Sequence, residues 1–454
     1  MDVPSSGRDV LEPALSPDGE CLYYAERLVN PRIYVDANHE TFAIRRLRFA
    51  SGETDTVVGG IGGAIRPALS PDGTKLAFIR RVMAKTVLFC LDLETGRQYP
   101  VFDGLDRDNQ AVWEIQGNYY PRFSWFPDNR TVAIWAGGKL NRIDMASGAC
   151  TPIPFRAECR HTLIDPVRAV HDLAPDKVEV KTVRHLAVAP GGDDVAFIAL
   201  SRLWHTTLGK DAVAPVGDHS QHALEPSYSR DGKWLAYVSW DDESGSTLNV
   251  CPRDGWDHSR VVTTSTGVIR QPAFSPDGKL LAYRLQDHDP NLGGSRARPG
   301  LYVVDATGAG TPPRYLGPCD DFPIFSPDGS RVYGNVTDSS GEEPVDVIVS
   351  VDLDGRDKRE HARAVDPDTY ELRLSPDHKW LGFRYASEYH VVPYRETGRP
   401  LAVSVATTEV PSHRLTENGG YALAWSSDGT SVHWAVGPDL HRRTTTDFET
   451  ATPA

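Results

Sequence analysis

The sequence predicts an all-β protein, a single β-propeller of four-stranded antiparallel blades, with nine blades expected and eight as the alternative. Three observations support this fold class. One hairpin motif recurs nine times along the 454 residues, the copies lie one blade apart, and almost no stretch has the 3.6-residue periodicity of a helix. We therefore expect residues 1–454 to form one propeller domain.

The hairpin motif places two apolar runs around a Ser-Pro-Asp-Gly turn, as in AFSPDGKLLAYRL at 273–285. Pro presets φ at the second turn position, Asp bonds nearby backbone amides, and Gly takes the left-handed conformation that closes the hairpin. Two glycine positions carry Asn129 and His378, of which the histidine fits that conformation less well. The nine copies span residues 11–26, 65–80, 121–136, 184–199, 224–239, 270–285, 321–336, 370–385 and 421–436.

The spacing of the copies indicates one blade per motif. Successive motif prolines, or their replacements, lie 54, 56, 63, 40, 46, 51, 49 and 51 residues apart, which suits four strands per repeat. A blade has two apolar faces and is stable only when neighbours cover both, as they do around a propeller axis. Residues 155–182 form an insertion with room for a short helix. Little sequence follows the last copy, so its blade either stays three-stranded or is completed by residues 1–10.

Composition excludes several classes of partner. A formal charge of −14 without a basic block argues against nucleic-acid binding, which depends on Lys and Arg at phosphates. No apolar run approaches the roughly 18 residues of a membrane span, and the first residues lack the basic and apolar regions of a signal peptide. We therefore expect a cytoplasmic protein with no membrane partner. Its six cysteines contain no CxxC pair and are expected to be reduced, buried or half-buried apolar residues.

The repeat resembles the PD40 (WD40-like) repeat of TolB-like β-propellers. The segments LEPSYSRDGKWLAYVSWDDESG (224–245) and LRLSPDHKWLGFRYASEYHVVPYRETGRP (372–400) are similar to the N-terminal propeller of a family of large bacterial proteins, in which a metal-dependent amidohydrolase barrel follows the propeller. This chain has no His-x-His metal motif and no residues left for a barrel of about 250 residues. The resemblance thus implies the propeller without the barrel's zinc ligands, and we expect no metal and no cofactor.

The candidate site residues stand five positions before the motif proline. The inner strand of a blade runs toward its turn, so this position lies at the opposite mouth of the central channel. It is occupied by Glu12, Arg66, Arg122, His185, Glu225, Gln271, Phe322, Glu371 and Ala422. We predict His185, Glu371, Glu225 and Glu12 as acid–base groups, and Arg66, Arg122 and Gln271 as ligand contacts, to which the loop 286–300 adds His288 and Arg296. The alternative is structural, because polar residues in a water-filled channel satisfy one another.

Two functions remain open. The first is a stand-alone binding module for a small polar ligand in the channel or for a protein partner, such as a separately encoded amidohydrolase-like enzyme. The second is an enzyme, a hydrolase, lyase or cyclase, that uses the acid–base groups at the channel mouth, as a biosynthetic enzyme would. Fold alone cannot choose between them. No G-x-S-x-G, HExxH, P-loop or G-x-G-x-x-G motif occurs in its required context, which favours the binding module.

Overall fold

The computed structural model describes residues 9–28, 40–110, 119–163, 172–210, 212–217, 220–242, 244–256, 258–286, 298–308, 310–406 and 410–450. Within these ranges the strands form nine sheets, seven of four strands, one of five and one of three. Every pairing between consecutive strands of a sheet is antiparallel, except one parallel pairing at the edge of the five-stranded sheet. The predicted all-β class and the predicted nine sheets are confirmed.

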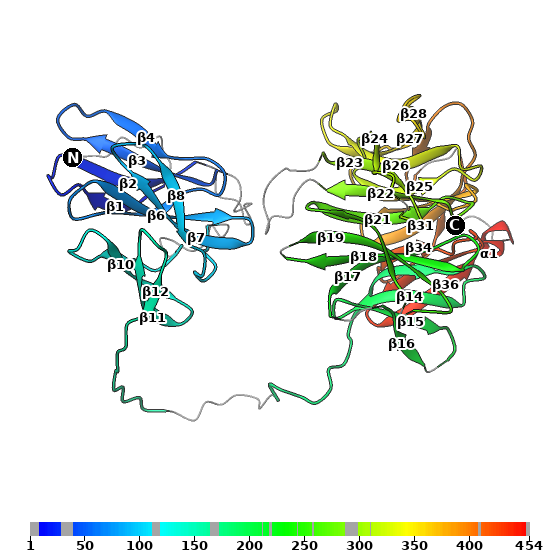
Figure 1. The fold of residues 1–454 in the computed structure, drawn as a ribbon. Coiled ribbons are helices and arrows are strands. Elements are labelled where there is room, and N and C mark those ends of the chain that lie inside the picture. The colour runs from blue at the N-terminus through cyan, green and yellow to red at the C-terminus, as the bar shows by residue number, and fades with distance from the viewer. Residues whose placement is uncertain are drawn as a thin grey trace. The chain divides into compact units, whose positions relative to one another are not determined.

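The nine sheets are divided between two compact units (Figure 1). Unit 1 comprises Met1–His171 with His288–Gly294, and unit 2 comprises Asp172–Asp287 with Ser295–Ala454. Unit 1 holds the first three sheets, coloured blue to cyan, and unit 2 holds the other six, coloured green to red. Each unit is described by itself.

The three sheets of unit 1 follow the chain in order. Their strands are β1 (Val10–Leu15), β2 (Cys21–Arg27), β3 (Phe42–Arg48), β4 (Thr54–Val58), β5 (Ile65–Leu69), β6 (Lys75–Val82), β7 (Lys85–Asp92), β8 (Gln98–Phe102), β9 (Ser124–Trp125), β10 (Thr131–Ala136), β11 (Lys139–Asp144) and β12 (Cys150–Pro152). Strands are adjacent in the orders β1-β2-β3-β4, β5-β6-β7-β8 and β9-β10-β11-β12. Each sheet is therefore one repeat with the motif hairpin as its first two strands.

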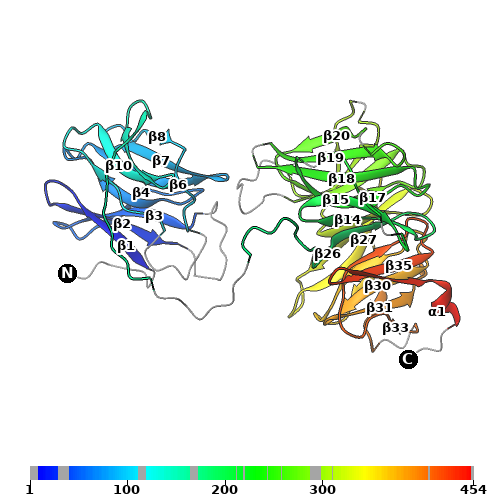
Figure 2. The same ribbon diagram turned by 90° about the horizontal axis from the view of Figure 1, so that it is seen from below.

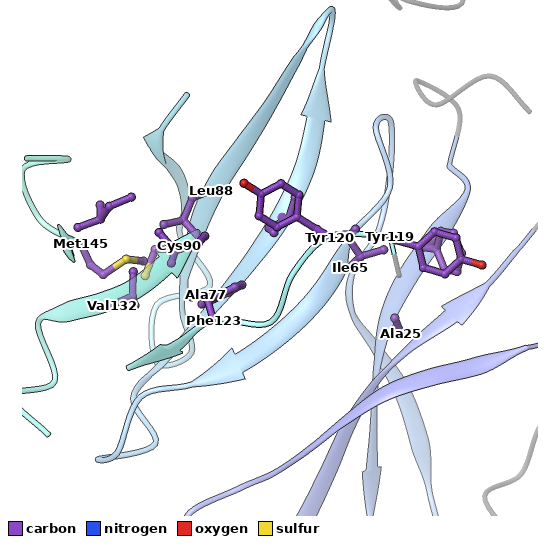
Figure 3. Packing of buried hydrophobic residues seen from close by; sticks show 14 residues of the cluster. Ala25, Ile65, Ala77, Leu88, Cys90, Tyr119, Tyr120, Phe123, Val132 and Met145 are labelled. Carbon is purple, nitrogen blue, oxygen red and sulfur yellow. The ribbon is translucent and has the colours of Figure 1, made fainter. Parts of the chain in front are cut away.

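The middle sheet of unit 1 buries both of its faces. Side chains alternate across a strand, so Leu76 and Phe78 of β6 pack toward the first sheet, while Ala77 and Ile79 pack toward the third. The second of these clusters runs on into Val132 of β10 and includes tyrosines that precede β9 (Figure 3). This two-sided burial is the property that the repeat sequence predicts for a blade.

Unit 2 contains six sheets. Their strands are β13 (Arg184–Val188), β14 (Asp194–Ala199), β15 (Arg202–Thr207), β16 (Val213–Pro215), β17 (His222–Tyr228), β18 (Trp234–Asp241), β19 (Gly245–Pro252), β20 (Arg260–Ser265), β21 (Val268–Phe274), β22 (Leu280–Gln286), β23 (Gly300–Asp305), β24 (Arg314–Gly317), β25 (Asp321–Phe325), β26 (Arg331–Asp338), β27 (Val345–Asp352), β28 (Arg359–Ala364), β29 (Thr369–Leu374), β30 (Trp380–Tyr385), β31 (Glu388–Pro393), β32 (Leu401–Val403), β33 (His413–Arg414), β34 (Tyr421–Trp425), β35 (Ser431–Val436) and β36 (Asp439–Thr444). The first strand of each motif hairpin, from β13 to β34, is the inner strand of its sheet.

The ring of unit 2 is closed by contacts between its first and last sheets. Ser427 N donates to Val188 O at 2.9 Å, and Gly191 N donates to Asp428 Oδ2 at 2.8 Å. Consistent with these bonds, the green first sheet lies beside the red last sheet in both views (Figures 1 and 2). The ninth motif thus meets the fourth, whereas a ring through all nine copies would bring it against the first.

Two features of unit 2 depart from a regular blade. Strand β32 pairs in parallel with β28 of the preceding sheet, although its neighbours in sequence belong to the next sheet. The last sheet has three strands in the described residues, one of the two expected outcomes. It is followed by the short helix α1 (Thr446–Thr450), drawn in red (Figure 2). Phe448 of this helix packs on Trp380 and His413 of the preceding sheet. No helix occurs in the described parts of the insertion, 155–163 and 172–182.

The turn chemistry is as predicted. In the sixth copy Asp277 Oδ1 accepts hydrogen bonds from Ser275 Oγ at 2.7 Å and from Lys279 N at 3.1 Å. Asn129 and His378, at two of the glycine positions, have φ of 56° and 54°, the left-handed conformation expected there.

The expectation for the cysteines is wrong at two positions. Cys150 and Cys159 are exposed, because β12 is an outer strand and Cys159 lies in the insertion after it. Among the described residues, no helix is both long and apolar enough to cross a membrane.

Candidate functional site

The position five residues before the motif proline has a common backbone conformation. Its residues have φ between 49° and 60° in eight of the nine repeats, namely Glu12, Arg66, His185, Glu225, Gln271, Phe322, Glu371 and Ala422. In each case the pairing of the inner strand with the second strand shifts register at this residue. Such β-bulges re-aim a side chain, and a positive φ is uncommon outside glycine. The fold therefore repeats one strained bulge along its inner strands.

The bulges connect neighbouring sheets. Glu225 Oε2 accepts a hydrogen bond from Gln271 N at 2.5 Å, and Gln271 Oε1 accepts one from Phe322 N at 2.9 Å. The side chain of Phe322 contains no hydrogen-bond acceptor. Asp346, in the same sheet as Phe322, instead accepts a hydrogen bond from Glu371 N at 3.0 Å. The side chain at one bulge thus caps the amide at the next, which is a structural role for residues predicted as catalytic or ligand-binding.

Unit 1 contains the same connection. Glu12 Oε2 accepts from Arg66 N at 2.6 Å, and Glu12 Oε1 lies 3.1 Å from Arg66 Nη1, both side chains being 6% exposed. Burial raises the pKa of Glu12, and the charge of Arg66 opposes that rise. Arg122, the third predicted residue of this unit, is exposed. These three residues belong to unit 1 and are not part of the cavity described next.

The channel of unit 2 is a cavity of about 690 Å³ lined by all six inner strands. At the loop mouth it is lined by His185, Glu225, Gln271, Phe322 and Ala422, one from each of five inner strands, and at the turn mouth it reaches Arg230, Pro276, Pro376 and Ser427. Three of the predicted site residues, His185, Glu225 and Gln271, therefore do lie together at one mouth of a channel, with the apolar Phe322 and Ala422 beside them, whereas the predicted Glu371 is not in the lining.

A charged network surrounds His185 at this mouth. His185 Nδ1 lies 3.5 Å from Glu225 Oε1, and Arg270 donates to the same oxygen from Nε at 2.8 Å and from Nη2 at 2.5 Å. Burial lowers the pKa of His185, the charge of Glu225 opposes this, and the guanidinium groups of Arg270 and other arginines add to it. His185 is thus neutral at neutral pH and could accept a proton.

The carboxylates beside the mouth are also engaged. Both oxygens of Glu371 accept hydrogen bonds from Tyr389 Oη, at 3.1 and 3.0 Å, and Oε1 also accepts from Arg373 Nη2 at 2.6 Å. Asp321 Oδ1 lies 3.2 Å from Arg284 Nη1. Burial raises the pKa of Asp321 and of Asp346, and for Asp346 the neighbouring carboxylates add to the rise.

Arg373 is a lining residue that the sequence analysis did not select. It stands three residues before the motif proline, in a column that reads Ala14, Ala68, Ser124, Ala187, Ser227, Ala273, Ile324, Arg373 and Ala424. A single arginine among small and aliphatic residues was the available signal. Its guanidinium carbon lies 3.9 Å from the centre of the Phe322 ring, so the side chain extends along the channel toward the loop mouth.

Two predicted ligand contacts, His288 and Arg296, lie outside the described residues. Among the residues that the structure does describe, no group of three or more His, Cys, Asp or Glu side chains could hold a metal ion.

Comparison with known proteins gives fold-level likeness only. No family model matches the chain, and no curated protein matches it. Among solved structures, the tricorn protease matches with a TM-score of 0.42 and 11% identity over 96% of this chain and 47% of its own, so the chain spans about half of that protein. Hydrazine synthase from Kuenenia stuttgartiensis matches with a TM-score of 0.40 and 15% identity over 73% of this chain and 99% of its own.

TolB from Acinetobacter baumannii matches with a TM-score of 0.23 and 16% identity over 67% of this chain and 62% of its own. The chain is thus similar in structure to β-propeller proteins. We rest no statement about its activity on these matches.

Proposed function

We propose that this chain is a binding module that holds a small polar ligand in the channel of unit 2. The observation that carries the proposal is the cavity of about 690 Å³ lined by all six inner strands. Ligand sites in proteins are typically concave, about 300–1,000 Å³ in volume, largely apolar, and supplied with a few polar groups that orient the ligand. Prolines, alanines, Phe322 and Ile324 supply the apolar wall here, and the arginines and His185 supply the polar groups.

The engagement of the carboxylates supports binding over catalysis. Both oxygens of Glu225 accept hydrogen bonds, one from an amide and the other from Arg270. Both oxygens of Glu371 accept from Tyr389. A catalytic acid or base needs an oxygen in reach of the proton that it transfers. The oxygens of Glu225 are already hydrogen-bonded by a neighbouring sheet, and those of Glu371 by its own sheet.

The sequence resemblance supports a second component of the proposal. The segments 224–245 and 372–400 resemble a propeller that precedes an amidohydrolase barrel in other proteins. A propeller of this kind would serve a separately encoded amidohydrolase-like enzyme by holding that enzyme or a ligand for it, in the cytoplasm. Copurification of such a barrel with this chain, and no turnover of small amides by the isolated chain, are the expected results.

Ligand binding is tested with a channel-blocking variant. Ala273→Trp fills the channel at mid-depth, whereas Ala146→Trp adds the same side chain at an exposed position of unit 1. The probes are citrate, glucose 6-phosphate, glutamate, glucose, trehalose and spermidine, added one at a time in thermal unfolding and calorimetry. We expect at least one probe to bind the unchanged chain and the Ala146→Trp variant but not Ala273→Trp. Equal binding by both variants, or binding of no probe, would contradict the proposal.

One observation favours an enzyme as the second candidate. His185 lines the channel, is neutral, and has Glu225 beside Nδ1, the arrangement of a histidine base oriented by a carboxylate. A substrate bound in the channel could transfer a proton to it. His185→Gln would then abolish turnover of that substrate while leaving its binding in place, whereas loss of binding alone would favour the module.

A further inference from the structure

Apart from Arg373, the layer of the channel that contains it has only small or aliphatic side chains. All six residues of unit 2 that stand three before the motif proline line the cavity, Ala187 and Ala424 with little exposed surface; they are Ala187, Ser227, Ala273, Ile324, Arg373 and Ala424. Small residues at this depth leave the space that the cavity occupies. Arg373 therefore faces open volume with no second charged residue from its own layer.

Arg373 is held in one orientation. Its Nη1 donates to Leu423 O, its Nη2 donates to Glu371 Oε1 at 2.6 Å, and its guanidinium lies against the Phe322 ring. Its Nε is buried and has no hydrogen-bond partner among the described residues, while the side chain as a whole is 24% exposed. A guanidinium that is already fixed loses little entropy when it binds an oxyanion, and the fixed plane selects planar or tetrahedral oxyanion groups.

The charges that line the cavity are mostly positive. They are Arg184, Arg230, Arg270 and Arg373 against the single carboxylate of Glu225, in a chain whose net charge is −14. Glu225 is matched by Arg270. Burial contributes most to the lowered pKa of His185, the charge of Glu225 opposes it, and three of these arginines add to it. The excess of arginines over carboxylates in the lining favours a positive potential, which walls of low dielectric strengthen.

The neighbouring acids do not reverse this balance. Asp321 and Glu371 lie beside the mouth and outside the lining. Asp321 is paired with Arg284, whereas Glu371 is paired with Arg373 and offsets part of its charge, which leaves the arginines of the lining in excess. The volume and the apolar wall, with Ile324 and Phe274 facing the cavity, suit an organic molecule better than a bare ion.

We infer that the channel of unit 2 binds a small organic anion, whose carboxylate, sulfonate or phosphate group lies against Arg373 and whose uncharged part packs on Ala273, Ile324 and Ala424. This inference rests on the proposed binding function and adds the chemical class of the ligand and the residue that selects it.

The sign of the potential can be measured without knowing the ligand. Cys21, Cys150 and Cys159 are the cysteines that are not buried, and they are replaced by serine. A single thiol is then introduced in the channel by Ser227→Cys, or at an exposed turn of unit 1 by Ser147→Cys as the control. Each protein is treated with anionic sulfonatoethyl methanethiosulfonate and with cationic trimethylammonioethyl methanethiosulfonate, and mass spectrometry gives the two rates. Their ratio cancels differences in thiol acidity between the sites.

We expect the ratio of anionic to cationic rates to be about tenfold higher in Ser227→Cys than in Ser147→Cys, because a cleft of one charge sign concentrates counter-ions. Adding Arg373→Gln should lower the channel ratio about fivefold, and Arg373→Lys should retain it. Arg359→Gln removes an exposed arginine of unit 2 outside the channel and should leave the ratio unchanged. Circular dichroism and thermal unfolding establish that each variant is folded.

The outcomes separate the inference from the proposed function. If neither reagent modifies Ser227→Cys in the folded protein, the channel does not admit small molecules and the proposed function fails. If both reagents react with the ratio of the control, the channel is open and only the inference is overturned. A high ratio that survives Arg373→Gln would overturn the assignment of Arg373.

Protection against the reagents tests the organic part of the ligand. Citrate is expected to slow modification of Ser227→Cys at lower concentration than inorganic phosphate, while choline and glucose are expected to have no effect. Equal protection by phosphate and citrate would show that the oxyanion group alone is bound, and protection by choline would overturn the charge preference.

Discussion

The two units are built from the same repeat and differ in whether the first and last sheets contact each other to close a ring. In unit 2 the last inner strand returns to the first, so six sheets share one closed channel. Unit 1 has three sheets in chain order. Some of its ionisable groups form buried ion pairs, such as that of Arg81 with Asp108, whose side chains are 1% and 0% exposed. The bulged inner position connects sheets in both units. It follows that the position can attach sheets in either unit, as Glu12, Glu225 and Gln271 do, and that lining a cavity is added where the ring closes.

Breaking the buried pair of unit 1 should give the largest effect. Asp108 accepts from Arg81 Nε at 2.9 Å and from Thr86 Oγ1 at 2.7 Å, so Asp108→Ala leaves a buried guanidinium without its anion. We expect a loss of about 3–5 kcal/mol in the free energy of unfolding. The control Asp103→Ala removes an exposed pair with Lys85 and should cost about 0.5 kcal/mol or less. Urea unfolding measures both, and equally small losses would show that the buried pair contributes no more to stability than the exposed pair.

Acid should weaken unit 2 more than unit 1. Burial lowers the pKa of His378 and of His433 to about 4, below the ordinary value of 6.5, and both belong to unit 2. Between pH 6.5 and 4 the unfolded chain binds protons that the folded chain does not, so stability falls as the pH falls through this window. The loss attributable to His433 is about 3 kcal/mol, for a side chain that is 1% exposed. In the described part of unit 1 the one histidine, His161, is exposed.

The pH effect is checked by urea unfolding at pH 7, 5.5 and 4. His433→Gln should flatten the dependence, whereas His441→Gln, at an exposed position of the last strand, should leave it unchanged. A slope that is the same in His433→Gln as in the unchanged chain would rule out His433 as its source.

Removing a bulge acceptor should cost a similar amount in either unit. Glu12→Ala and Glu225→Ala each leave an amide and a guanidinium without their acceptor, at an expected cost of about 2–3 kcal/mol. Glu225→Gln keeps an oxygen for the amide of Gln271 and should cost less. If Glu225→Ala were neutral while Glu12→Ala was not, the structural role would be limited to unit 1.

The smallest expected effect concerns the backbone of the bulge. Ala422 has φ of 57°, which glycine adopts without strain, so Ala422→Gly should stabilise the protein by about 0.5–1 kcal/mol. Ala424, two residues later in the same strand, is not among the residues with positive φ. Ala424→Gly should therefore destabilise by about 0.5–1 kcal/mol. Changes of the same sign in a thermal unfolding assay would contradict the assignment of strain to the bulge.

Most of the fold could be predicted from the sequence because each hairpin contains the residues that its turn requires. The Ser-Pro-Asp-Gly copies give the number of sheets, and Asn129 and His378 mark left-handed turns even where glycine is missing. Which sheets close the ring could not be predicted from the sequence, because every blade has apolar faces of the same kind. Nothing in the repeat that contains Val188 distinguishes it as the partner of Ser426.

The site was predicted in part. Counting back from the motif proline finds His185, Glu225 and Gln271 at one mouth of the channel. It does not predict the bulge, because a register shift requires no particular residue type. It also does not predict that these side chains cap the amides of the next sheet. Arg373 was within reach of the same alignment two positions further on, where an arginine replaces alanine or serine.

The hydrogen bonds that join neighbouring sheets at their bulges also bear on how such a chain can gain or lose repeats. At three junctions of unit 2 the acceptor is a side chain, from Glu225, Gln271 or Asp346, but the donor is a main-chain amide that every repeat possesses. At such a junction a duplicated repeat can be inserted without a matching side chain in the neighbour that donates. Genetic tandem duplication therefore needs no new side chain on the donor side of such a junction, and the donor residue can drift as long as it keeps its amide and tolerates a positive φ, which excludes proline.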